Sequence, residues 1–516
     1  MSRLRRPAVL VPLAVGVVVL GAAAFAVPAV RGGDATLRGL PTGPLDAAAL
    51  QSAQVQVDGG GHPSRLLVDG QQVARSSGAP LVHALGALPD GTHTLVTEVD
   101  RGFPRGTVRT ERKVVVDTTP PQLRLDVIKP VGIKDKVTVT GQAEGAARLS
   151  VGDREVRPGK DGRFSVAFDT PPAGQQLVAL DAAGNRAVMP LDVPVAHPGM
   201  RAVHLTALAW TAKSLREPVL ALAKAGKIDT VELDIKDESG EVGYDSQVPL
   251  ARQIGASKGY YDARKALAQL HGMHVRVVGR LVAFRDPLLA PWASKHGHKD
   301  WVIQAPDGSP YQSKYGGFTN FASPAVRAYN IDIAVEAAKL GFDDVLYDYC
   351  RRPDGTLSTM RFPGLKETPS QSIAGFMRES RAALRPLGVY VGASVFGIAA
   401  DRPDQIAQNV PMMGRYVDFV APMVYPSHWG AGEYGVSNPN SSPGPIVERS
   451  LKVFQKDLQG TTVAVTPWLQ DFSLGVHYGP AEVKAQIDAA KRDGIDSFLL
   501  WNAGAKYQGA ALTAKK

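Results

Sequence analysis

The stretch "GFDDVLYDYCRRPDG", residues 341–355, decides the fold. The run VRAYNIDIAVEAAKL, residues 326–340, is typical of a helix, and Gly341 after it is typical of a helix C-terminus. A short apolar run then ends on an acid, Asp348. Because side chains alternate along a strand, Leu346 and Asp348 share one face. The stretch therefore predicts a helix followed by a buried strand with a carboxylate at its carboxyl end.

The same pattern of a helical run followed by an apolar strand recurs through the C-terminal part of the chain. Several of the helical runs end in Gly, as AEVKAQIDAAKRDG does at 481–494. Eight units of this kind predict a (β/α)8 TIM barrel over residues 197–516. The eight strand candidates are residues 202–210, 230–237, 275–284, 343–350, 389–397, 417–425, 462–470 and 497–504.

A doubly wound open sheet is the alternative for this region. Such sheets usually carry a glycine-rich phosphate-binding turn after the first strand. The segment AWTAKSL, residues 209–215, has no glycine. The barrel is therefore the favoured interpretation.

The chain between about residues 50 and 196 has a different character. Short alternating runs such as HTLVTEVD and KVTVTGQA are separated by Gly, Pro and Asp turns every 8–12 residues. This spacing predicts two antiparallel β-sandwiches, at 46–118 and 119–196. ALDAAGNRA, residues 179–187, resembles the last hairpin of bacterial Ig-like domains. Two roles remain open for these sandwiches, as spacers or as polymer-binding modules.

The N-terminus predicts export. Arg3, Arg5 and Arg6 precede an uncharged apolar run over 8–30, and Ala24-Phe25-Ala26 would serve as a cleavage site. The run is also long enough to remain as a membrane anchor. Residues 1–30 are therefore a signal peptide or an anchor, and the Gly/Pro-rich residues 31–45 are a linker. The rest of the chain is expected outside the cytoplasm, secreted or anchored to the cell membrane.

Charge and cysteine content exclude several classes of function. The formal net charge is +9, but the basic residues are scattered and no nucleic-acid motif accompanies them, so no nucleic-acid partner is expected. The charge fits attraction to an anionic cell-wall polymer or membrane surface. Cys350 is the sole cysteine, which excludes an intrachain disulfide.

The candidate catalytic residues come from the strand ends, because the active site of a TIM barrel lies at the carboxyl ends of its strands. Asp348 is the first candidate; a plain ion pair with Arg351 or Arg352 is the alternative. In TVELDIKDESG, residues 230–240, alternation places Glu232, Asp234 and Lys236 on one inward face. Asp234 and Asp237 lie nearest the mouth and are functional candidates; a charged network filling the barrel is the alternative.

Other strand ends carry polar and aromatic groups that suit binding of sugars. No metal or other cofactor is expected, because the close pairs His271/His274 and His296/His298 fall at the wrong barrel face and in a loop. The expected substrate-binding residues are Trp210, Arg280, Arg351, Tyr425, His428, Trp468, Asp471, Trp501 and Asn502.

These motifs carry a resemblance over roughly residues 200–505. VELDIKDESGEVGYDSQVPLARQIGA, GRLVAFRDPLLA, GFDDVLYDYCRRPDG and APMVYPSHW resemble a bacterial glycoside hydrolase family long classified as a domain of unknown function. The resemblance implies a barrel distantly related to alpha-amylase-type enzymes, with an aspartate at the end of strand four, here Asp348. The family usually has valine and phenylalanine where this chain has Cys350 and Arg352, which alters the surroundings of that aspartate.

The function expected from these observations is that of an exported glycoside hydrolase acting on a cell-surface or extracellular polysaccharide. Asp348 would be the nucleophile, and Asp237 or Asp234 the acid. One alternative is a non-catalytic cell-wall polysaccharide-binding protein on a degenerate barrel; a carbohydrate deacetylase, which needs a metal, is a third. The first two differ over whether a second carboxylate lies within about 5–10 Å of Asp348.

Overall fold

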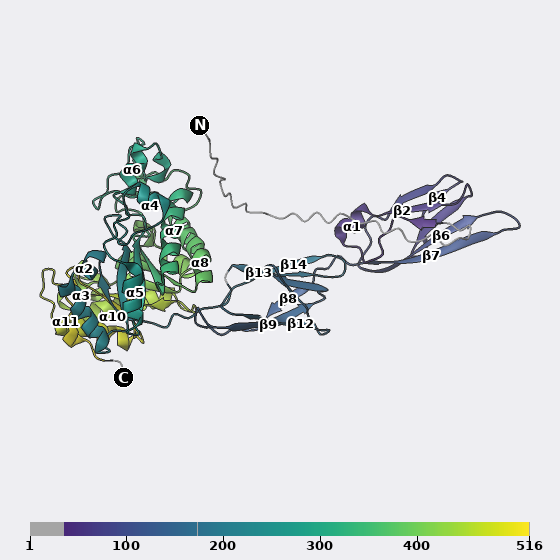
Figure 1. Ribbon diagram of the computed structural model, residues 1–516. Coiled ribbons are helices and arrows are strands. Elements are labelled where there is room, and N and C mark those ends of the chain that lie inside the picture. The colour runs from purple at the N-terminus through teal and green to yellow at the C-terminus, as the bar shows by residue number, and fades with distance from the viewer. Residues whose placement is uncertain (1–35, 173, 515–516) are drawn as a thin grey trace, which may run out of the picture. The chain divides into compact units, whose positions relative to one another are not determined.

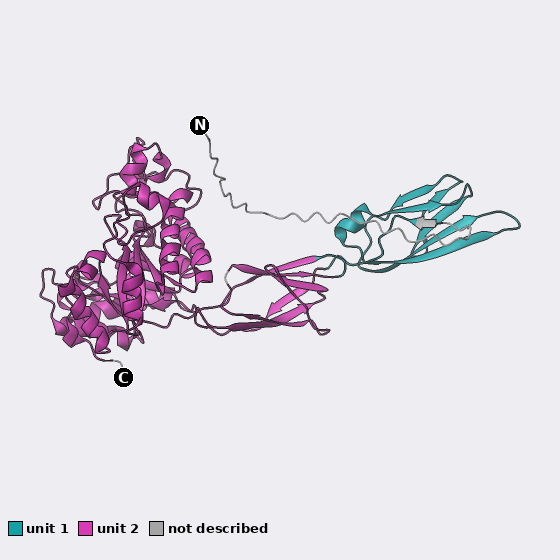
Figure 2. Ribbon diagram, viewed as in Figure 1, with its two compact units in different colours: residues 1–119, 182–185 teal, residues 120–181, 186–516 magenta. Residues whose placement is uncertain are grey.

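The computed structural model describes residues 36–172 and 174–514. The predicted signal or anchor segment, residues 1–30, lies outside these ranges. Within them, no helix is long and apolar enough to cross a membrane. The chain divides into two compact units, residues up to 119 with 182–185, and residues 120–181 with 186–516 (Figure 2).

The first unit contains two antiparallel sheets around one apolar core. Its elements are β1 (Thr36–Arg38), α1 (Ala47–Ser52), β2 (Gln54–Asp58), β3 (Ser64–Val68), β4 (Gln71–Ser76), β5 (Leu81–Ala84), β6 (Gly91–Asp100) and β7 (Thr107–Val116). The strand orders are β1-β2-β5 and β4-β3-β6-β7. Val55 and Val57 of the first sheet and Leu66 and Leu95 of the second belong to the same buried cluster, so the sheets face each other.

The second unit begins with another pair of antiparallel sheets. Their strands are β8 (Gln122–Leu125), β9 (Val137–Glu144), β10 (Arg148–Val151), β11 (Arg154–Val156), β12 (Arg163–Phe168), β13 (Gln175–Leu180) and β14 (Arg186–Leu191). The orders are β12-β9-β8 and β11-β10-β13-β14. The two predicted β-rich regions are thus antiparallel sheets, while their Ig-like class and the boundaries 46–118 and 119–196 stay predictions.

A closed parallel barrel follows, which confirms the predicted fold of the C-terminal region. Its strands are β15 (Arg201–Leu205), β16 (Thr230–Lys236), β17 (Arg276–Val282), β18 (Asp344–Asp348), β19 (Tyr390–Phe396), β20 (Phe419–Met423), β21 (Ala464–Val465), β22 (Trp468–Gln470) and β23 (Phe498–Trp501). β21 and β22 both pair with β20 and share the seventh position. Pairing of β19 with β20 closes the barrel, which therefore has eight strand positions.

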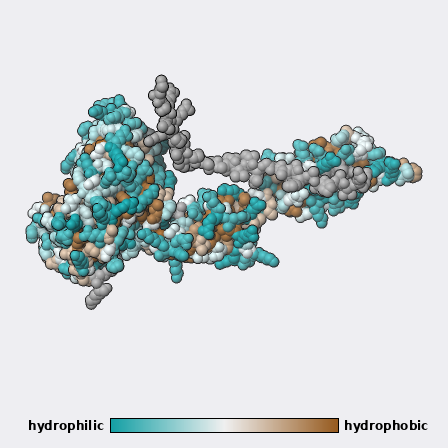
Figure 3. Space-filling view, in the orientation of Figure 1, coloured by the Kyte–Doolittle hydropathy of each residue, from teal (hydrophilic) through white to brown (hydrophobic). Residues whose placement is uncertain are grey.

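Helices surround the barrel strands (Figure 1). Gly341 ends α7 in the left-handed region, at φ 119°, and turns the chain back toward β18. The surface seen in Figure 3 is mostly hydrophilic, because the apolar faces of these helices pack inward. The helices are α2 (Ala207–Thr211), α3 (Lys213–Lys224), α4 (Pro249–Gln253), α5 (Ala263–His271), α6 (Leu289–Lys295), α7 (Pro324–Leu340), α8 (Pro369–Leu384), α9 (Val410–Gly414), α10 (Pro443–Asp457) and α11 (Pro480–Arg492).

The inside of the barrel has its own apolar cluster, separate from the layer between strands and helices. Val278, Leu346 and Phe419 belong to it, and so does Ile133 from the segment between β8 and β9. The backbone N–H of Ile133 also donates to the hydroxyl of Tyr390, the first residue of β19. The amino-terminal end of the barrel is therefore packed by a residue from outside the barrel.

One predicted side-chain direction is wrong. Lys236 does not share the inward face of β16 with Glu232 and Asp234, because a bulge between Asp234 and Lys236 shifts the register against β17. The Lys236 ammonium instead lies in the outer layer, 2.7 Å from Asp286 and 3.0 Å from the Asn330 amide oxygen on α7.

Candidate active site

A pocket of about 460 Å³ lies where the carboxyl ends of the barrel strands meet. A pocket of this size is within the usual range for small-molecule sites. Its wall combines carboxylates with aromatic rings. It is lined by Glu238, Arg280, Tyr315, Asp348, Tyr349, Asp354, Phe396, Gly397, Ile398, Met423, Tyr425, His428, Trp429, Trp468 and Trp501.

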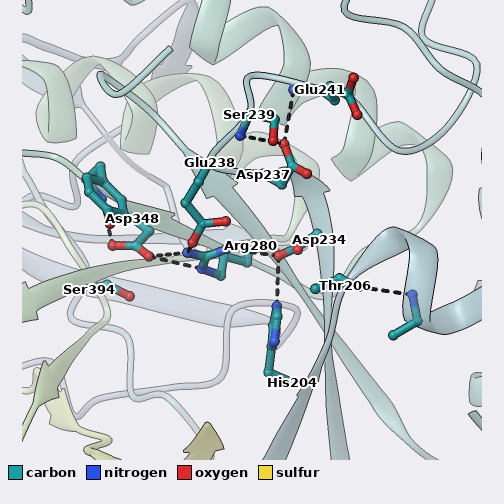
Figure 4. Close-up of polar contacts among 12 residues, drawn as sticks. His204, Thr206, Asp234, Asp237, Glu238, Ser239, Glu241, Arg280, Asp348 and Ser394 are labelled. Carbon is teal, nitrogen blue, oxygen red and sulfur yellow. Dashed lines mark hydrogen bonds and ion pairs between the residues drawn. The ribbon is translucent and has the colours of Figure 1, made fainter. Parts of the chain in front are cut away.

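Arg280 of β17 is the centre of the polar network in this pocket (Figure 4). Its Nε and Nη2 donate to Oδ2 of Asp348 at 3.0 and 2.6 Å, and its Nη1 donates to Oδ1 of Asp234 at 3.1 Å. Nη2 also donates to Oε1 of Glu238. The guanidinium is only 2% exposed, so three carboxylates surround one buried cation.

Asp348 ends β18 at the mouth of the barrel, as the sequence predicts. Its second oxygen, Oδ1, accepts a hydrogen bond of 2.7 Å from the backbone N–H of Tyr349. Tyr349 has a φ of 51°, in the left-handed region that non-glycine residues seldom adopt. Such backbone strain clusters at functional sites.

Below Arg280 the network continues into the barrel. His204 of β15 contacts Oδ1 of Asp234 through Nε2 at 2.9 Å, and its ring stacks on Trp501 at a centroid distance of 4.3 Å. The guanidinium of Arg280 lies 5.3 Å from the centre of the Trp501 ring. Asp234 therefore orients Arg280 from beneath and does not line the pocket itself.

Glu238 is a functional candidate that the sequence pattern does not predict. It lies two residues beyond the end of β16, next to the predicted Asp237. Burial opposes ionisation of Glu238, but the charge of Arg280 and the hydrogen bond from it outweigh burial and lower the pKa to about 2. The signal available in the sequence was an acid directly after a strand that already carried an E-x-D pattern.

Glu232 is a further carboxyl group inside the barrel. It is fully buried, and neither side-chain oxygen has a hydrogen-bond partner among the described residues. Burial raises its pKa well above the usual value, and Arg280 offsets this only in part. Glu232 is thus the member of the charged row predicted on β16 whose ionisation is opposed by burial.

The two arginines after Asp348 do not pair with it. Arg351 donates through Nη1 to the carbonyl of Arg352 and to Asp354. Arg352 donates to backbone carbonyls, including that of Gly355. The left-handed turn at Tyr349 leads the chain away from the end of β18, so the ion pair of Asp348 is made by Arg280.

The structure brings six of the predicted residues to the pocket wall: Arg280, Asp348, Tyr425, His428, Trp468 and Trp501. Trp468 is fixed there by a hydrogen bond of 3.0 Å from its ring N–H to Ser394. Burial lowers the pKa of His428. These residues lie at the ends of separate strands, and closure of the barrel brings those ends together around the pocket.

The other predicted residues lie outside the wall. Asp237 turns away from Arg280 and accepts hydrogen bonds from the backbone of Ser239 and Glu241 (Figure 4); burial raises its pKa to about 6. Trp210 is buried on α2, because Thr206 caps a helix where the sequence predicted a continuing strand.

Asp471, Asn502 and Arg351 are likewise not part of the lining. Asp471 accepts from the backbone N–H of Gln508, and burial raises its pKa to about 7. The Asn502 amide donates to the carbonyls of Asp471 and Lys506, so it fixes a loop. Arg351 lies behind the wall, against rings that line it.

Within residues 36–172 and 174–514, no group of three or more His, Cys, Asp or Glu side chains is arranged to hold a metal ion. The carboxylates of the pocket are instead gathered around a guanidinium. Carboxylates in such a pocket are able to act as acid, base or nucleophile, next to aromatic surfaces.

One family model matches the barrel region of the chain. The model of a family described as "Putative glycosyl hydrolase domain" matches residues 202–507. No curated protein matches the sequence. A hypothetical protein from Ruminiclostridium thermocellum is 30% identical, with 37% of this chain and 96% of that chain covered and a TM-score of 0.34.

Two enzyme structures are also similar. The glycoside hydrolase domain of PgaB (BpsB) from Bordetella bronchiseptica is 15% identical, with 60% of this chain and 95% of that chain covered and a TM-score of 0.45. The endo-1,4-beta-D-mannanase of Thermotoga petrophila is 13% identical, with 59% and 88% covered and a TM-score of 0.40.

Proposed function

Because the chain belongs to the glycosyl hydrolase family whose model spans residues 202–507, we propose that its pocket cleaves a glycosidic bond of a polysaccharide with two carboxylates, Asp348 and Glu238. One observation carries the choice of this pair: an oxygen of each bonds to the same nitrogen, Nη2 of Arg280, and both residues line the pocket. Two such contacts keep the oxygens within about 6 Å of each other.

That spacing favours a retaining mechanism. Retaining glycosidases hold their two carboxyl groups about 5–5.5 Å apart, and inverting enzymes need more room for a water molecule. In the proposed reaction, Asp348 attacks the anomeric carbon while the glycosidic oxygen leaves with a proton from Glu238. Water then cleaves the resulting ester, and Glu238 takes back a proton.

The surroundings of Asp348 fit a nucleophile. Arg280 and the Tyr349 N–H hold both of its oxygens, which fixes the direction in which the carboxylate points. Asp348 is also almost fully buried. A rigid, ionised carboxylate is what attack on carbon requires.

Glu238 needs to gain a proton before it acts as the acid. Its side chain is 30% exposed and comes from a loop, so it is freer to move than Asp348. The contact with Arg280 is what holds its pKa near 2, against the opposing effect of burial. When substrate hydroxyls replace Glu238 on Arg280, we expect burial to dominate and the pKa to rise, as proton donation demands.

The aromatic wall supports a sugar substrate. Tyr425, Trp468 and Trp501 present ring surfaces within the same pocket as the two carboxylates. Flat apolar rings with polar neighbours match the faces and hydroxyl groups of a sugar. Because the N-terminal residues 1–30 predict export, the substrate is proposed to be a cell-surface or extracellular polysaccharide.

A second candidate function is polysaccharide binding without cleavage. The observation that favours it is that Asp348, Glu238 and Asp354, the three pocket carboxylates, each have an arginine partner in this structure. A pocket of paired carboxylates next to aromatic rings is able to bind sugars without reacting. Cleavage assays separate the two functions.

The roles of the two carboxylates are tested by chemical rescue. A panel of polysaccharides first identifies a cleaved glycan and its sugar, from which an aryl glycoside is made. Glu238→Gln should then lose most activity on the polysaccharide yet still release the aryl group rapidly in the first turnover of an aryl glycoside with a good leaving group, because that step needs no acid. Asp348→Gly should be inactive on both and recover with azide, giving a glycosyl azide.

The opposite pattern would show that the proposed roles are wrong: Glu238→Gly inactive on both substrates and rescued by azide that attacks the substrate directly, while Asp348→Asn still releases the aryl group. No cleavage of any glycan by the wild-type chain, together with binding to polysaccharide, would instead support the second candidate.

A further inference from the structure

Arg351 is a buried arginine behind one end of the pocket. Its guanidinium lies 4.3 Å from the centre of the Phe396 ring and 5.2 Å from that of Tyr349. The Phe318 and Tyr315 rings lie at 5.5 and 5.9 Å. Three of these four rings, Tyr315, Tyr349 and Phe396, line the pocket, so Arg351 stands directly behind its wall.

The hydrogen bonds of Arg351 leave one edge of the guanidinium unused. Nη1 donates to the Arg352 carbonyl at 2.8 Å and to Asp354 at 3.3 Å. Nε and Nη2 are buried and have no hydrogen-bond partner among the described residues. These two donors form the side-on edge of the guanidinium, whose parallel N–H groups match the two oxygens of a carboxylate or phosphate.

This end of the pocket has an excess of positive charge. The Arg285 guanidinium lies 5.2 Å from the centre of the Tyr349 ring, and the Lys314 ammonium lies 5.6 Å from that of Tyr315. Arg285 donates to the carbonyl of Tyr315 and to the hydroxyl of Tyr349, not to a carboxylate. Asp354, with a side chain 46% exposed, is the carboxylate paired with Arg351. The other end, around Arg280, has an excess of carboxylates.

We propose that Arg351, Arg285 and Lys314 form an anion subsite that binds a carboxylate or phosphate substituent of the glycan, with the side-on edge of Arg351 as its main contact. This inference rests on the proposed function for its place in a glycan-cleaving pocket. For the anionic group to reach Arg351 from the pocket, the side chain of Tyr315 has to move; Tyr315 is 36% exposed and belongs to the pocket wall. The substrate class is therefore an acidic polysaccharide.

Desolvation supports this assignment. Burial lowers the pKa of Arg351, and Asp354 offsets this only in part. A buried cation with too few partners is costly, and an anion that reaches it supplies the missing charge and both missing acceptors. A neutral sugar supplies neither, so the subsite discriminates between the two.

The test measures binding without turnover, in the full chain with Asp348→Asn. Calorimetric titrations at low salt compare trigalacturonic acid, its neutral methyl ester and a glycerol phosphate trimer. We expect at least one anionic probe to bind about tenfold more tightly than the neutral ester. Adding Arg351→Met should remove that preference, and high salt should reduce it. Galacturonate and glycerol phosphate separate a carboxylate from a phosphate as the natural group.

The control is Arg264→Met on α5, which removes the same charge from an exposed position and should leave the preference intact. Methionine fills a similar volume without a buried charge, so the melting temperature should not fall. If Arg351→Met does not fold, Arg351→Lys tests the proposal instead: it keeps the charge, lacks the paired donors, and should lose most of the preference.

Equal binding of all three probes, or a preference that survives both Arg351 variants, would overturn the anion subsite. This result is distinguishable from failure of the proposed function. The enzyme would then still cleave neutral glycans, whereas failure of the proposed function is the absence of cleavage in the chain with Asp348 intact.

Discussion

Arg280 donates two hydrogen bonds to one oxygen of Asp348, at 3.0 Å from Nε and 2.6 Å from Nη2. The other oxygen of Asp348 accepts from the backbone N–H of Tyr349. Arg280 is itself oriented by Asp234, which contacts His204. The carboxylate is thus fixed by elements from β15 to β18 before any substrate arrives, which is the preorganisation that catalysis requires.

Asp348→Asn should abolish glycan cleavage with little loss of stability. The change removes one negative charge at nearly constant shape, and Arg280 keeps two carboxylate partners, Asp234 and Glu238. We expect activity to fall by about 10³-fold or more, as for loss of a nucleophile. Reducing-sugar release and thermal melting measure the two effects. Retained cleavage with a lower melting temperature would make Asp348 a structural ion-pair partner.

Arg280→Met should destabilise the chain strongly at neutral pH. Three carboxylates would lose their common cation in a buried site, a change that costs about 3–5 kcal/mol. In the variant, Arg280 no longer offsets the burial of Glu238, so the folded-state pKa of Glu238 should lie above its unfolded value and stability should fall as pH rises through 4 to 7. Denaturant unfolding at pH 4 and pH 7 measures this.

The matched control is Arg402→Met, which breaks a partly exposed pair with Glu433 and should cost less than about 1 kcal/mol. An Arg280→Met chain as stable as the wild type at pH 7 would show that the buried network does not need its cation.

The sequence predicts the barrel well because eight strands repeat one simple pattern. Asp348 is found for the same reason: in a parallel barrel the last residue of a strand lies at the active-site end. These inferences need only the alternation of side chains and the length of each segment, and both are local properties.

Three residues show why the rest could not be predicted. The strand pattern extends over Trp210, but the Thr206 side chain caps a short helix there. Alternation predicts Lys236 inside the barrel, but one bulge turns it outward. No local pattern selects Glu238, because its role depends on Arg280, which is 42 residues away in the sequence. Caps, bulges and long-range ion pairs leave no periodic signal.

Asp471→Asn should stabilise the protein above neutral pH. Burial raises the pKa of Asp471 to about 7, and one of its oxygens, Oδ1, has no partner among the described residues. The folded state therefore binds a proton that the unfolded state has released, so the wild type loses stability as pH rises from about 4 to about 7. The variant avoids this loss.

Melting temperatures at pH 4 and pH 8 measure the effect: the gain from Asp471→Asn should be larger at pH 8. The control is Asp496→Asn, an exposed position in the loop before β23, where we expect no difference between the two pH values. A gain of equal size at both pH values would mean that Asp471 is not a buried acid with a raised pKa.

The barrel should fold alone but melt below a chain that begins at residue 120. The predicted domain boundary lies at residue 197, yet Ile133 and Val195, both before it, belong to the buried cluster inside the barrel. Losing the burial of two such side chains costs about 3–6 kcal/mol. Residues 197–516 should therefore show a cooperative transition at a lower temperature than residues 120–516. The exposed pair between Arg381 and Asp192, 3.1 Å, should contribute little to the difference.

Ile133→Ala in the longer chain should reproduce part of the loss, about 2–4 kcal/mol, because it leaves a cavity against Tyr390 and removes no other contact between the regions. If residues 197–516 show no cooperative transition, the boundary is wrong. If they melt at the same temperature as residues 120–516, Ile133 covers the barrel without stabilising it.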